Sequence, residues 1–339
     1  MTVAAALFPP CAGRGLRLGL GGAPLGNLFA RVEAAEAQAT LDAAWHGGCR
    51  SFDTAPHYGQ GLSEQRFGDA LRARPRASFV LSTKVGRLLT PNAAAASDHE
   101  GYVGVLAFDT HWDYSAAGVR RSLEDSLRRL GLERIDVAYV HDCDAATHGP
   151  RAAAVLRQVI DETLPALQRM KAEGLIRAIG LGVNDVAVVL DVLREAELDA
   201  LLLAGRYSLL DHSALPALLP LCRARGIHLA LGGVFNSGLL ATGTRSTLGP
   251  PTFNYAPAAR EWVLCTQRIE AACDMHGVAL RAAALQFALA HPAVEIVMLG
   301  ARSAAEWQDA QAMLRQPIPP AFWHALREAR LLPEEAPTP

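Results

Sequence analysis

The sequence lacks an excess of either charge and lacks long apolar runs. Its 32 lysines and arginines stand against 34 aspartates and glutamates, which leaves a formal net charge of −2. That balance gives no reason to expect binding to nucleic acid or to an anionic membrane surface. No uninterrupted apolar stretch reaches the roughly 18 residues that a membrane-spanning helix needs. We therefore expect neither a nucleic-acid partner nor a membrane partner.

Cysteine is also scarce, with six residues in 339, and no two of them form a Cys-X-X-Cys pair. Such a pattern is not a disulfide framework, so we expect reduced thiols and a cytoplasmic protein. The N-terminal apolar stretch has no basic residue before it, and Pro9 and Pro10 stand where a signal peptidase site has small residues. A secretory signal is therefore not expected.

Apolar side chains, in contrast, are abundant. Hydrophobic residues make up 50% of the chain and charged residues 19%, a composition that supports a large core and argues against disorder. A chain of 339 residues is long enough for two domains, although an α/β barrel of this length often forms a single one.

Eight short apolar runs alternate with helical patterns. We predict strands at Leu16–Leu20, Arg50–Asp53, Phe79–Thr83, Ile135–Val140, Ile176–Leu181, Ala200–Ala204, Ile227–Leu231 and Glu295–Leu299. We predict helices near 33–47, 62–73, 116–130, 152–173, 185–197, 212–225, 260–276 and 303–315, with a further one over 281–290. Glycines such as Gly131 and Gly226 follow helical runs, as C-terminal caps do.

Strands that are apolar throughout and separated by helices predict a parallel sheet covered on both faces. Eight such units in about 300 residues fit an α/β fold of the (β/α)8 TIM-barrel type, and a doubly wound sheet is the alternative. We assign residues 13–330 to a single barrel domain, with an N-terminal tail over 1–12 and a C-terminal tail over 331–339.

Two connections are too long for ordinary turns. They run from Gly86 to about Tyr114, after the third strand, and from Gly232 to about Pro257, after the seventh. Both follow the carboxyl ends of strands, which is the face where barrel enzymes build their active sites. The first loop holds four aromatic residues, whereas disordered loops are usually poor in aromatics. We therefore expect folded loops beside an active site, with flexible insertions as the alternative.

Three ionisable residues end consecutive predicted strands: Asp53, Lys84 and His141. Tyr58 lies five residues after the first of them. Adjacent parallel strands lie about 4.8 Å apart, so these side chains can converge at one rim of the barrel. Each residue alone has a simpler explanation, such as a solvated lysine or a turn-forming aspartate, but the four together indicate a site.

The four residues suit general acid–base chemistry. A phenol has a pKa near 10, and a nearby ammonium lowers that pKa. We expect Lys84 to supply the charge, Asp53 to hold Lys84, and His141 to bond the substrate oxygen. Tyr58 then acts as the general acid in carbonyl reduction or the general base in alcohol oxidation. Because no strong nucleophile is present, hydride exchange with a nicotinamide cofactor fits best.

Three stretches resemble motifs of the aldo-keto reductase superfamily: Ser51–Ala55 with Tyr58-Gly59, Ser82–Val85, and Leu130–Asp136 leading into the strand with His141. The resemblance covers roughly residues 13 to 315, and it implies a barrel oxidoreductase that uses NAD or NADP, with Asp53, Tyr58, Lys84 and His141 as its catalytic tetrad. Within the superfamily the chain is most similar to bacterial sugar and pyridoxal dehydrogenases, through Lys84–Leu89, Phe108-Asp109, Asp113–Ser115 and Phe235–Gly238.

The resemblance also implies a cofactor site. Asn184 would hold the nicotinamide amide and Tyr207 would stack on the nicotinamide ring. The pyrophosphate would lie on the backbone of Phe235, Asn236, Ser237, Gly238 and Leu239, because converging amide N–H groups bind phosphate oxygens. The adenosine end would lie at Gly300, Arg302 and Ser303.

Two positions depart from the family pattern. Ala204 stands where many members have a glutamine that holds the nicotinamide amide, and Ala310 where many have an asparagine that closes the adenine site. Arg302 either pairs with a 2′-phosphate or stacks on adenine. Because no second basic residue follows within Ser303–Asp309, NAD is favoured over NADP.

We reject two further signals. Gly19–Pro24 resembles a GxGxxG motif, but a proline stands at the third glycine and no helix opens at the loop. His141–Asp144 alternates along an extended chain, so its side chains cannot easily share a metal ion.

The substrate is expected to be a small sugar or carbonyl compound. The resemblance favours oxidation of an aldose of the L-fucose or D-threo-aldose type at C1 to a lactone. Trp112 and Tyr114 would offer flat apolar faces to the sugar, and Asp109, His111, Asp113 and His57 would bond its hydroxyls; alternatively, the aromatic residues pack the loop onto the barrel. The other functions are a pyridoxal or general carbonyl oxidoreductase and, more remotely, a cofactor-binding regulatory barrel. We expect a monomer or a weak homo-oligomer.

Overall fold

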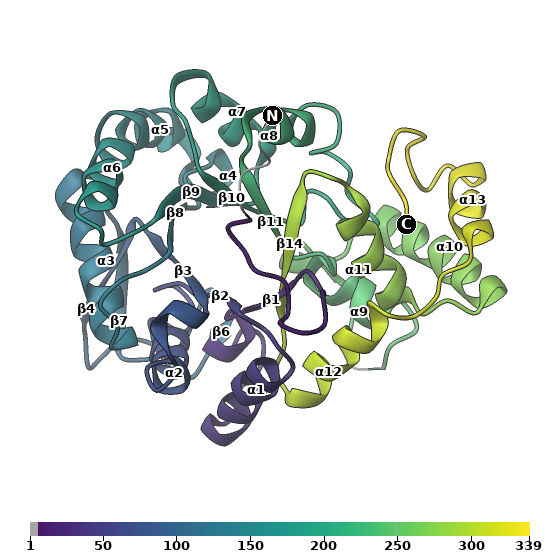
Figure 1. Ribbon diagram of the computed structural model, residues 1–339, viewed down its shortest axis with the longest axis horizontal. Helices are drawn as coiled ribbons and strands as arrows, with labels where there is room; N and C mark the ends of the chain where they lie inside the picture. Colours follow the sequence, from purple (N-terminus) through teal and green to yellow (C-terminus); the bar gives the residue numbers. More distant parts are fainter. Residues whose placement is uncertain (1–5, 248) are drawn as a thin grey trace.

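Eight parallel strands close into a barrel in the computed structural model, which describes residues 6–247 and 249–339. Around the barrel their order is β1-β14-β11-β10-β9-β8-β3-β2, and Figure 1 shows helices flanking them. The (β/α)8 prediction is confirmed and the doubly wound alternative is wrong. The strands are β1 (Leu18–Gly21), β2 (Ser51–Asp53), β3 (Val80–Val85), β8 (Val137–His141), β9 (Ala178–Val183), β10 (Ala200–Ala204), β11 (His228–Gly232) and β14 (Val294–Gly300).

Helices separate these strands. They are α1 (Ala34–His46), α2 (Leu62–Leu71), α3 (Ala116–Leu130), α4 (Ala145–His148), α5 (Ala152–Gln158), α6 (Leu164–Ala172), α7 (Val186–Glu195), α8 (Leu218–Arg225), α9 (Leu239–Thr242), α10 (Arg260–His276), α11 (Leu280–Ala290), α12 (Ala304–Met313) and α13 (Pro320–Glu328). A π-helical turn over Val159–Thr163 joins α5 to α6. Gly131 and Gly226 end α3 and α8 in the left-handed conformation, as predicted.

Helix α8 begins later than the predicted residue 212. The Ser208 hydroxyl accepts hydrogen bonds from the backbone N–H groups of Leu210 and Asp211, and Asp211 accepts one from Ser213. Such side-chain bonds offer the backbone an alternative to the helix. Helix α13 was not predicted; it buries Phe322, Trp323 and Leu326 beside α10, at the right of Figure 1.

The core has two layers because strand residues alternate in direction. Tyr139, Leu202 and Ile296 belong to an inner cluster, while their neighbours pack outward against the helices. Phe8 joins the inner cluster and is only 2% exposed. The predicted N-terminal tail therefore contacts the barrel through its described residues, 6–12, while residues 1–5 lie outside the described part of the chain.

Both long loops contain strands of their own. In the 86–114 loop, β4 (Arg87–Pro91) pairs with β7 (Phe108–Trp112) and β5 (Asp98–His99) pairs with β6 (Tyr102–Val103). The loop after β11 carries α9 and a hairpin of β12 (Thr252–Phe253) and β13 (Ala256–Pro257). These antiparallel pairs support the expectation of folded loops over flexible insertions.

Candidate active site

A buried ion pair anchors the site at the carboxyl ends of β2 and β3. The Lys84 ammonium donates to Asp53 Oδ2 at 2.8 Å and to the Thr54 carbonyl at 3.0 Å. Asp53 Oδ1 accepts a hydrogen bond from the Ser82 hydroxyl at 2.7 Å. Both charged residues are at most 3% exposed. A buried pair with its remaining hydrogen bonds satisfied is held in one geometry, and loss of either partner leaves an uncompensated charge.

The other two predicted catalytic residues lie beside this pair. Lys84 Nζ is 4.6 Å from the centre of the Tyr58 ring, and the His141 ring centre is 6.2 Å from that of Tyr58. His141 ends β8, next to β3 in the barrel. The structure therefore brings Asp53, Tyr58, Lys84 and His141 together at the rim.

The ionisation of Tyr58 differs from the expectation. Burial raises the pKa of Tyr58 well above its ordinary value, and the nearby Asp53 carboxylate raises it further. The expected lowering by Lys84 does not prevail, because burial disfavours the charged phenolate more strongly. Tyr58 is thus a neutral phenol at ordinary pH, and a neutral phenol can donate a proton to a carbonyl oxygen.

His141 is neutral as well. Burial lowers the pKa of this imidazole well below 6.5, and the cations Arg87 and Lys84 lower it further. Its Nε2 atom lies 3.4 Å from Asp142 Oδ2. A neutral imidazole can hydrogen-bond an oxygen without adding a charge to the site.

Arg87 organises the wall next to His141. Its guanidinium donates to Glu100 at 2.8 Å, contacts His57 Nδ1 at 3.1 Å and lies 3.4 Å from Asp142. The pKa of His57 falls to about 2 through burial and the charge of Arg87. Burial raises the pKa of Asp142 to about 6. The His57 ring, 6.0 Å from that of His141, is therefore a neutral neighbour of the tetrad.

The prediction that Trp112 and Tyr114 offer flat apolar faces to the sugar is wrong for Tyr114. That residue is 2% exposed, and its hydroxyl donates to the His141 carbonyl at 2.6 Å. Trp112 stacks on Tyr114 at 5.6 Å between ring centres, while Arg87 covers the indole at 3.8 Å. Two of the residues predicted to bond sugar hydroxyls form hydrogen bonds within the loop instead. Asp109 accepts one from the Asn92 side chain, and Asp113 accepts one from the Ser115 N–H. Tyr114 thus supports the backbone of His141, and Trp112 packs on Tyr114.

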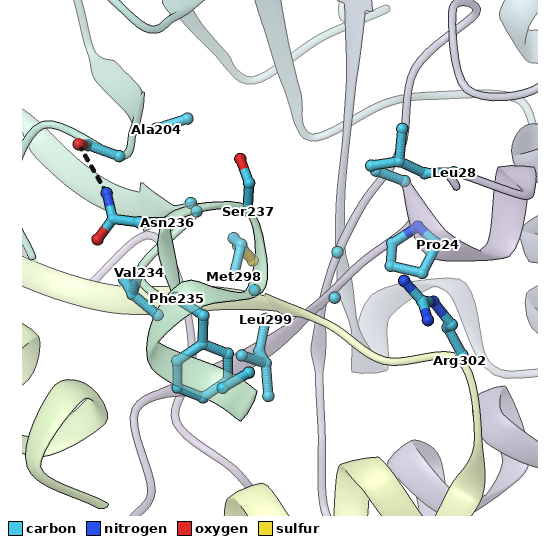
Figure 2. A pocket seen from close by; sticks show the side chains of 18 of the residues that line it. Pro24, Leu28, Ala204, Val234, Phe235, Asn236, Ser237, Met298, Leu299 and Arg302 are labelled. Carbon is cyan, nitrogen blue, oxygen red and sulfur yellow. Dashed lines mark hydrogen bonds between the residues drawn. The ribbon is translucent and has the colours of Figure 1, made fainter. Parts of the chain in front are cut away.

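A cavity of about 650 Å³ opens beside two residues of the tetrad and extends across the barrel mouth. It is lined by Asp53 and Tyr58 and by seven of the predicted cofactor residues: Asn184, Phe235, Asn236, Ser237, Gly238, Gly300 and Arg302. Ala204 and Ala310, the two departures from the family pattern, line it too. In Figure 2 Pro24, Leu28 and Arg302 lie on one side of the view, opposite Asn236 and Ser237.

Three predicted cofactor residues point elsewhere. Tyr207 is 1% exposed and stacks on Phe287 with ring centres 5.1 Å apart, so it is a core residue. The prediction for Leu239 concerns its backbone N–H, and this group donates to the Asn236 carbonyl. The Ser303 hydroxyl caps α12 by accepting the Glu306 N–H at 3.2 Å.

The backbone after β11 forms a tight left-handed turn at the edge of the cavity. Asn236, Ser237 and Gly238 have consecutive φ values of 44°, 57° and 102°. Within this turn the N–H groups of Asn236 and Gly238 donate to the carbonyls of Gly233, at 2.8 Å, and Phe235, at 3.0 Å, so the protein itself holds these two groups. The Asn236 amide stabilises the turn by donating to the Gly205 carbonyl at 3.4 Å (Figure 2).

Sequence reasoning missed several lining residues, namely Gly21, Gly22, Ala23, Pro24, Phe29, Asn254, Tyr255, Arg281, Glu306 and Asp309. The glycine-rich turn Gly19–Pro24 was a signal in the sequence for the first four of these residues, although it is not a GxGxxG motif. A Cβ on Gly22 would lie 2.9 Å from the Asp53 carbonyl, so only glycine lets this turn pack against the catalytic strand.

The lining fits a dinucleotide. Tyr58, Asn184, the turn over residues 235–238 and Arg302 all border one cavity, in which an elongated molecule can lie. When bound there, a nicotinamide cofactor supplies or accepts a hydride at the substrate carbon. Among residues 6–247 and 249–339, no group of three or more His, Cys, Asp or Glu could hold a metal ion. No helix in that same part of the chain is long and apolar enough to cross a bilayer.

A closed parallel barrel with this tetrad and this cavity defines a barrel oxidoreductase that uses a nicotinamide cofactor. The chain belongs to the Aldo/keto reductase family, whose model matches residues 17–330. It is 43% identical over 328 residues to pyridoxal 4-dehydrogenase from Microbacterium luteolum, covering 93% of this chain and 94% of that one.

Two further comparisons agree. The chain is 39% identical to D-threo-aldose 1-dehydrogenase from a Pseudomonas species, covering 96% of this chain and 98% of the relative. Its fold matches the holo form of an aldo-keto reductase from Bacillus halodurans with a TM-score of 0.70 and 26% identity, over 96% of this chain and 97% of that one. The protein is therefore an NAD(P)-dependent oxidoreductase.

Proposed function

We propose that the protein oxidises the C1 hydroxyl of an aldose in its ring form to a lactone, with NAD as the hydride acceptor. The observation that carries the proposal is the tetrad at the edge of a dinucleotide cavity, in a chain similar along its length to D-threo-aldose 1-dehydrogenase. The C1–H bond gives up a hydride and the O1–H bond gives up a proton, so the lactone carbonyl forms with both accounted for.

Each tetrad residue has a part in this reaction. His141, as a neutral imidazole, bonds the reacting oxygen and orients it toward Tyr58. Tyr58, in its deprotonated form, accepts the hydroxyl proton as C1 gives up its hydride. Lys84 stabilises the negative charge that develops on the phenol, and Asp53 keeps Lys84 charged and in place.

The charges at the adenosine end support NAD. Arg302 lies there, and beside it the Glu306 carboxylate accepts the Arg302 backbone N–H at 2.8 Å, a contact that does not involve the guanidinium. Arg281, the second cation that lines the cavity, is paired with Asp309 at 2.8 Å. Carboxylates accept hydrogen bonds from ribose hydroxyls and repel a 2′-phosphate. With its second cation neutralised, this end favours the cofactor that lacks the phosphate.

A second candidate is oxidation of pyridoxal, favoured by the 43% identity to pyridoxal 4-dehydrogenase. The aldehyde of pyridoxal closes with its neighbouring hydroxymethyl group to a hemiacetal, so the same C1-type oxidation gives a lactone. General aldehyde reduction uses the same residues in reverse. A regulatory barrel without turnover would not need the buried Lys84–Asp53 pair.

The test is a substrate panel read at the absorbance of NADH. L-fucose, D-arabinose, L-galactose, D-glucose and pyridoxal are each offered with NAD and with NADP. The proposal expects the highest kcat/KM for an aldose with NAD, and a lactone as the product by mass spectrometry. Highest kcat/KM for pyridoxal selects the second candidate, and NADH binding without turnover of any compound selects the regulatory barrel.

A further inference from the structure

Two aromatic residues at the mouth of the barrel are exposed and adopt an unusual backbone conformation. Phe29 is 43% exposed and Tyr255 56%, and their φ values are 62° and 63°. Left-handed backbone is uncommon for bulky residues, which pay for it in strain. Neither residue is used by the mechanism above, yet both line its cavity.

Tyr255 sits in the turn of the β12–β13 hairpin, next to Asn254 with a φ of 48°. A two-residue turn with both residues left-handed normally prefers Asn followed by Gly. Here a tyrosine takes the second place, and the turn is fixed from both sides. The Tyr255 N–H donates to the Ser237 hydroxyl at 2.9 Å. Arg206 bonds both Asn254, at 3.1 Å, and the Asn184 carbonyl, at 2.6 Å.

The fixed turn directs the Tyr255 side chain into the site. Tyr255 lines the same cavity as Asn184 and Tyr58. It is therefore partly open to solvent and partly turned toward the cavity beside the tetrad.

Phe29 approaches from the opposite loop, between β1 and α1. Its N–H donates to the Gly101 carbonyl at 2.8 Å, and its ring centre lies 6.3 Å from that of Tyr255 at an interplanar angle of 39°. We call these two residues the aromatic roof. It joins the β1–α1 loop to the β12–β13 hairpin above the cavity that holds Tyr58 and Asn184.

We propose that the aromatic roof determines substrate specificity by covering one face of a six-membered ring, while the Tyr255 hydroxyl bonds a polar group of that ring. Aromatic faces pack on the C–H side of a pyranose and stack on a pyridine. A substrate hydroxyl that becomes buried on binding costs free energy if it has no hydrogen-bond partner, and the Tyr255 hydroxyl can be that partner. Open-chain aldehydes have no ring to cover. The proposal rests on the function above and names the substrate class as cyclic.

The test compares cyclic and open-chain substrates in Tyr255→Ala, Tyr255→Phe and Phe29→Ala. The matched control is Met275→Ala, which removes a side chain that is 79% exposed on α10. The cyclic substrates are L-fucose and pyridoxal; the open-chain substrate is the best of propanal, methylglyoxal and glyceraldehyde. The dissociation constant of NADH is measured for every variant by fluorescence, before any substrate is added.

We expect Tyr255→Ala to lower kcat/KM for the cyclic substrates about 10- to 100-fold, by loss of a stacking face and a hydrogen bond. The open-chain substrate and the NADH dissociation constant should change by less than about threefold, as in the control. Tyr255→Phe should keep part of the selectivity, because the ring remains.

Equal losses on all substrates would overturn the proposal, and a tenfold weaker NADH complex with equal losses would show that the roof holds the dinucleotide instead. Failure of the proposed function would give a different experimental result from these. If the enzyme oxidises no aldose, the comparison of pyridoxal with the open-chain substrate still decides whether the roof selects rings.

Discussion

The two long loops at the mouth of the barrel use their aromatic residues in opposite ways. In the 86–114 loop, Trp112 and Tyr114 stack on each other beneath Arg87, and the Tyr114 hydroxyl is used up on the backbone of β8. In the loop after β11, Tyr255 is 56% exposed and lines the cavity. An aromatic residue beside an active site is thus either a buried support or a contact surface, and its exposure distinguishes the two.

The largest effect on the reaction rate should come from a substitution of Tyr58, the residue that transfers the proton. We expect Tyr58→Phe to lower kcat about 10²- to 10⁴-fold, since the proton transfer is lost. The NADH dissociation constant should stay within about threefold, because the phenol is not needed to hold the dinucleotide. Steady-state kinetics and NADH fluorescence measure the two quantities. A rate within threefold of the unmodified enzyme would refute the assignment of the tetrad.

The support role of the 86–114 loop predicts a loss of stability. Tyr114→Ala should lower the free energy of unfolding by about 3 kcal/mol or more, as for other buried aromatics. It should also lower kcat/KM equally for a sugar and for a small aldehyde, because His141 moves for both. Urea denaturation and parallel kinetics check this. A selective loss on the sugar with unchanged stability would mean that this loop offers a flat apolar face to the sugar after all.

The neutral state of Tyr58 predicts different pH profiles for the two reaction directions. Because its pKa lies well above 10, Tyr58 keeps its proton from pH 6 to 9 and is ready for reduction throughout. Oxidation needs the deprotonated form, so its kcat/KM should rise with pH, by up to about tenfold per unit. Profiles of both directions with the same sugar test this. An oxidation rate that levels off near neutrality would show that Lys84 lowers the pKa after all.

The smallest expected effect concerns the cofactor. Glu306→Gln removes a carboxylate beside Arg302 and should improve kcat/KM with NADP by about three- to tenfold, since the repulsion of a 2′-phosphate decreases. Arg302→Ala should weaken NAD and NADP alike if the guanidinium stacks on adenine. A loss confined to NADP would mean that Arg302 binds the phosphate and that NAD is not preferred.

The strand ends could be predicted from the sequence because short-range patterns determine them. Continuous apolar runs specify buried parallel strands, and parallel topology places Asp53, Lys84 and His141 at one rim. The roof could not be predicted in this way. Phe29 and Tyr255 are 226 positions apart in the sequence, and they meet only because two loops with left-handed turns cross the mouth. Tyr207 shows a different kind of error. Its position in a motif predicted stacking on the nicotinamide, but its ring is stacked on Phe287.

The central claim is that C1 of a ring-form aldose gives its hydrogen to the nicotinamide with the help of Tyr58. Incubating the enzyme with NAD and L-fucose deuterated at C1 tests this directly by mass spectrometry of the reduced cofactor. The account predicts one deuterium in each NADH formed, a lactone in equal amount, and almost no label transfer with Tyr58→Phe. Unlabelled NADH, or label transfer undiminished in Tyr58→Phe, would contradict it.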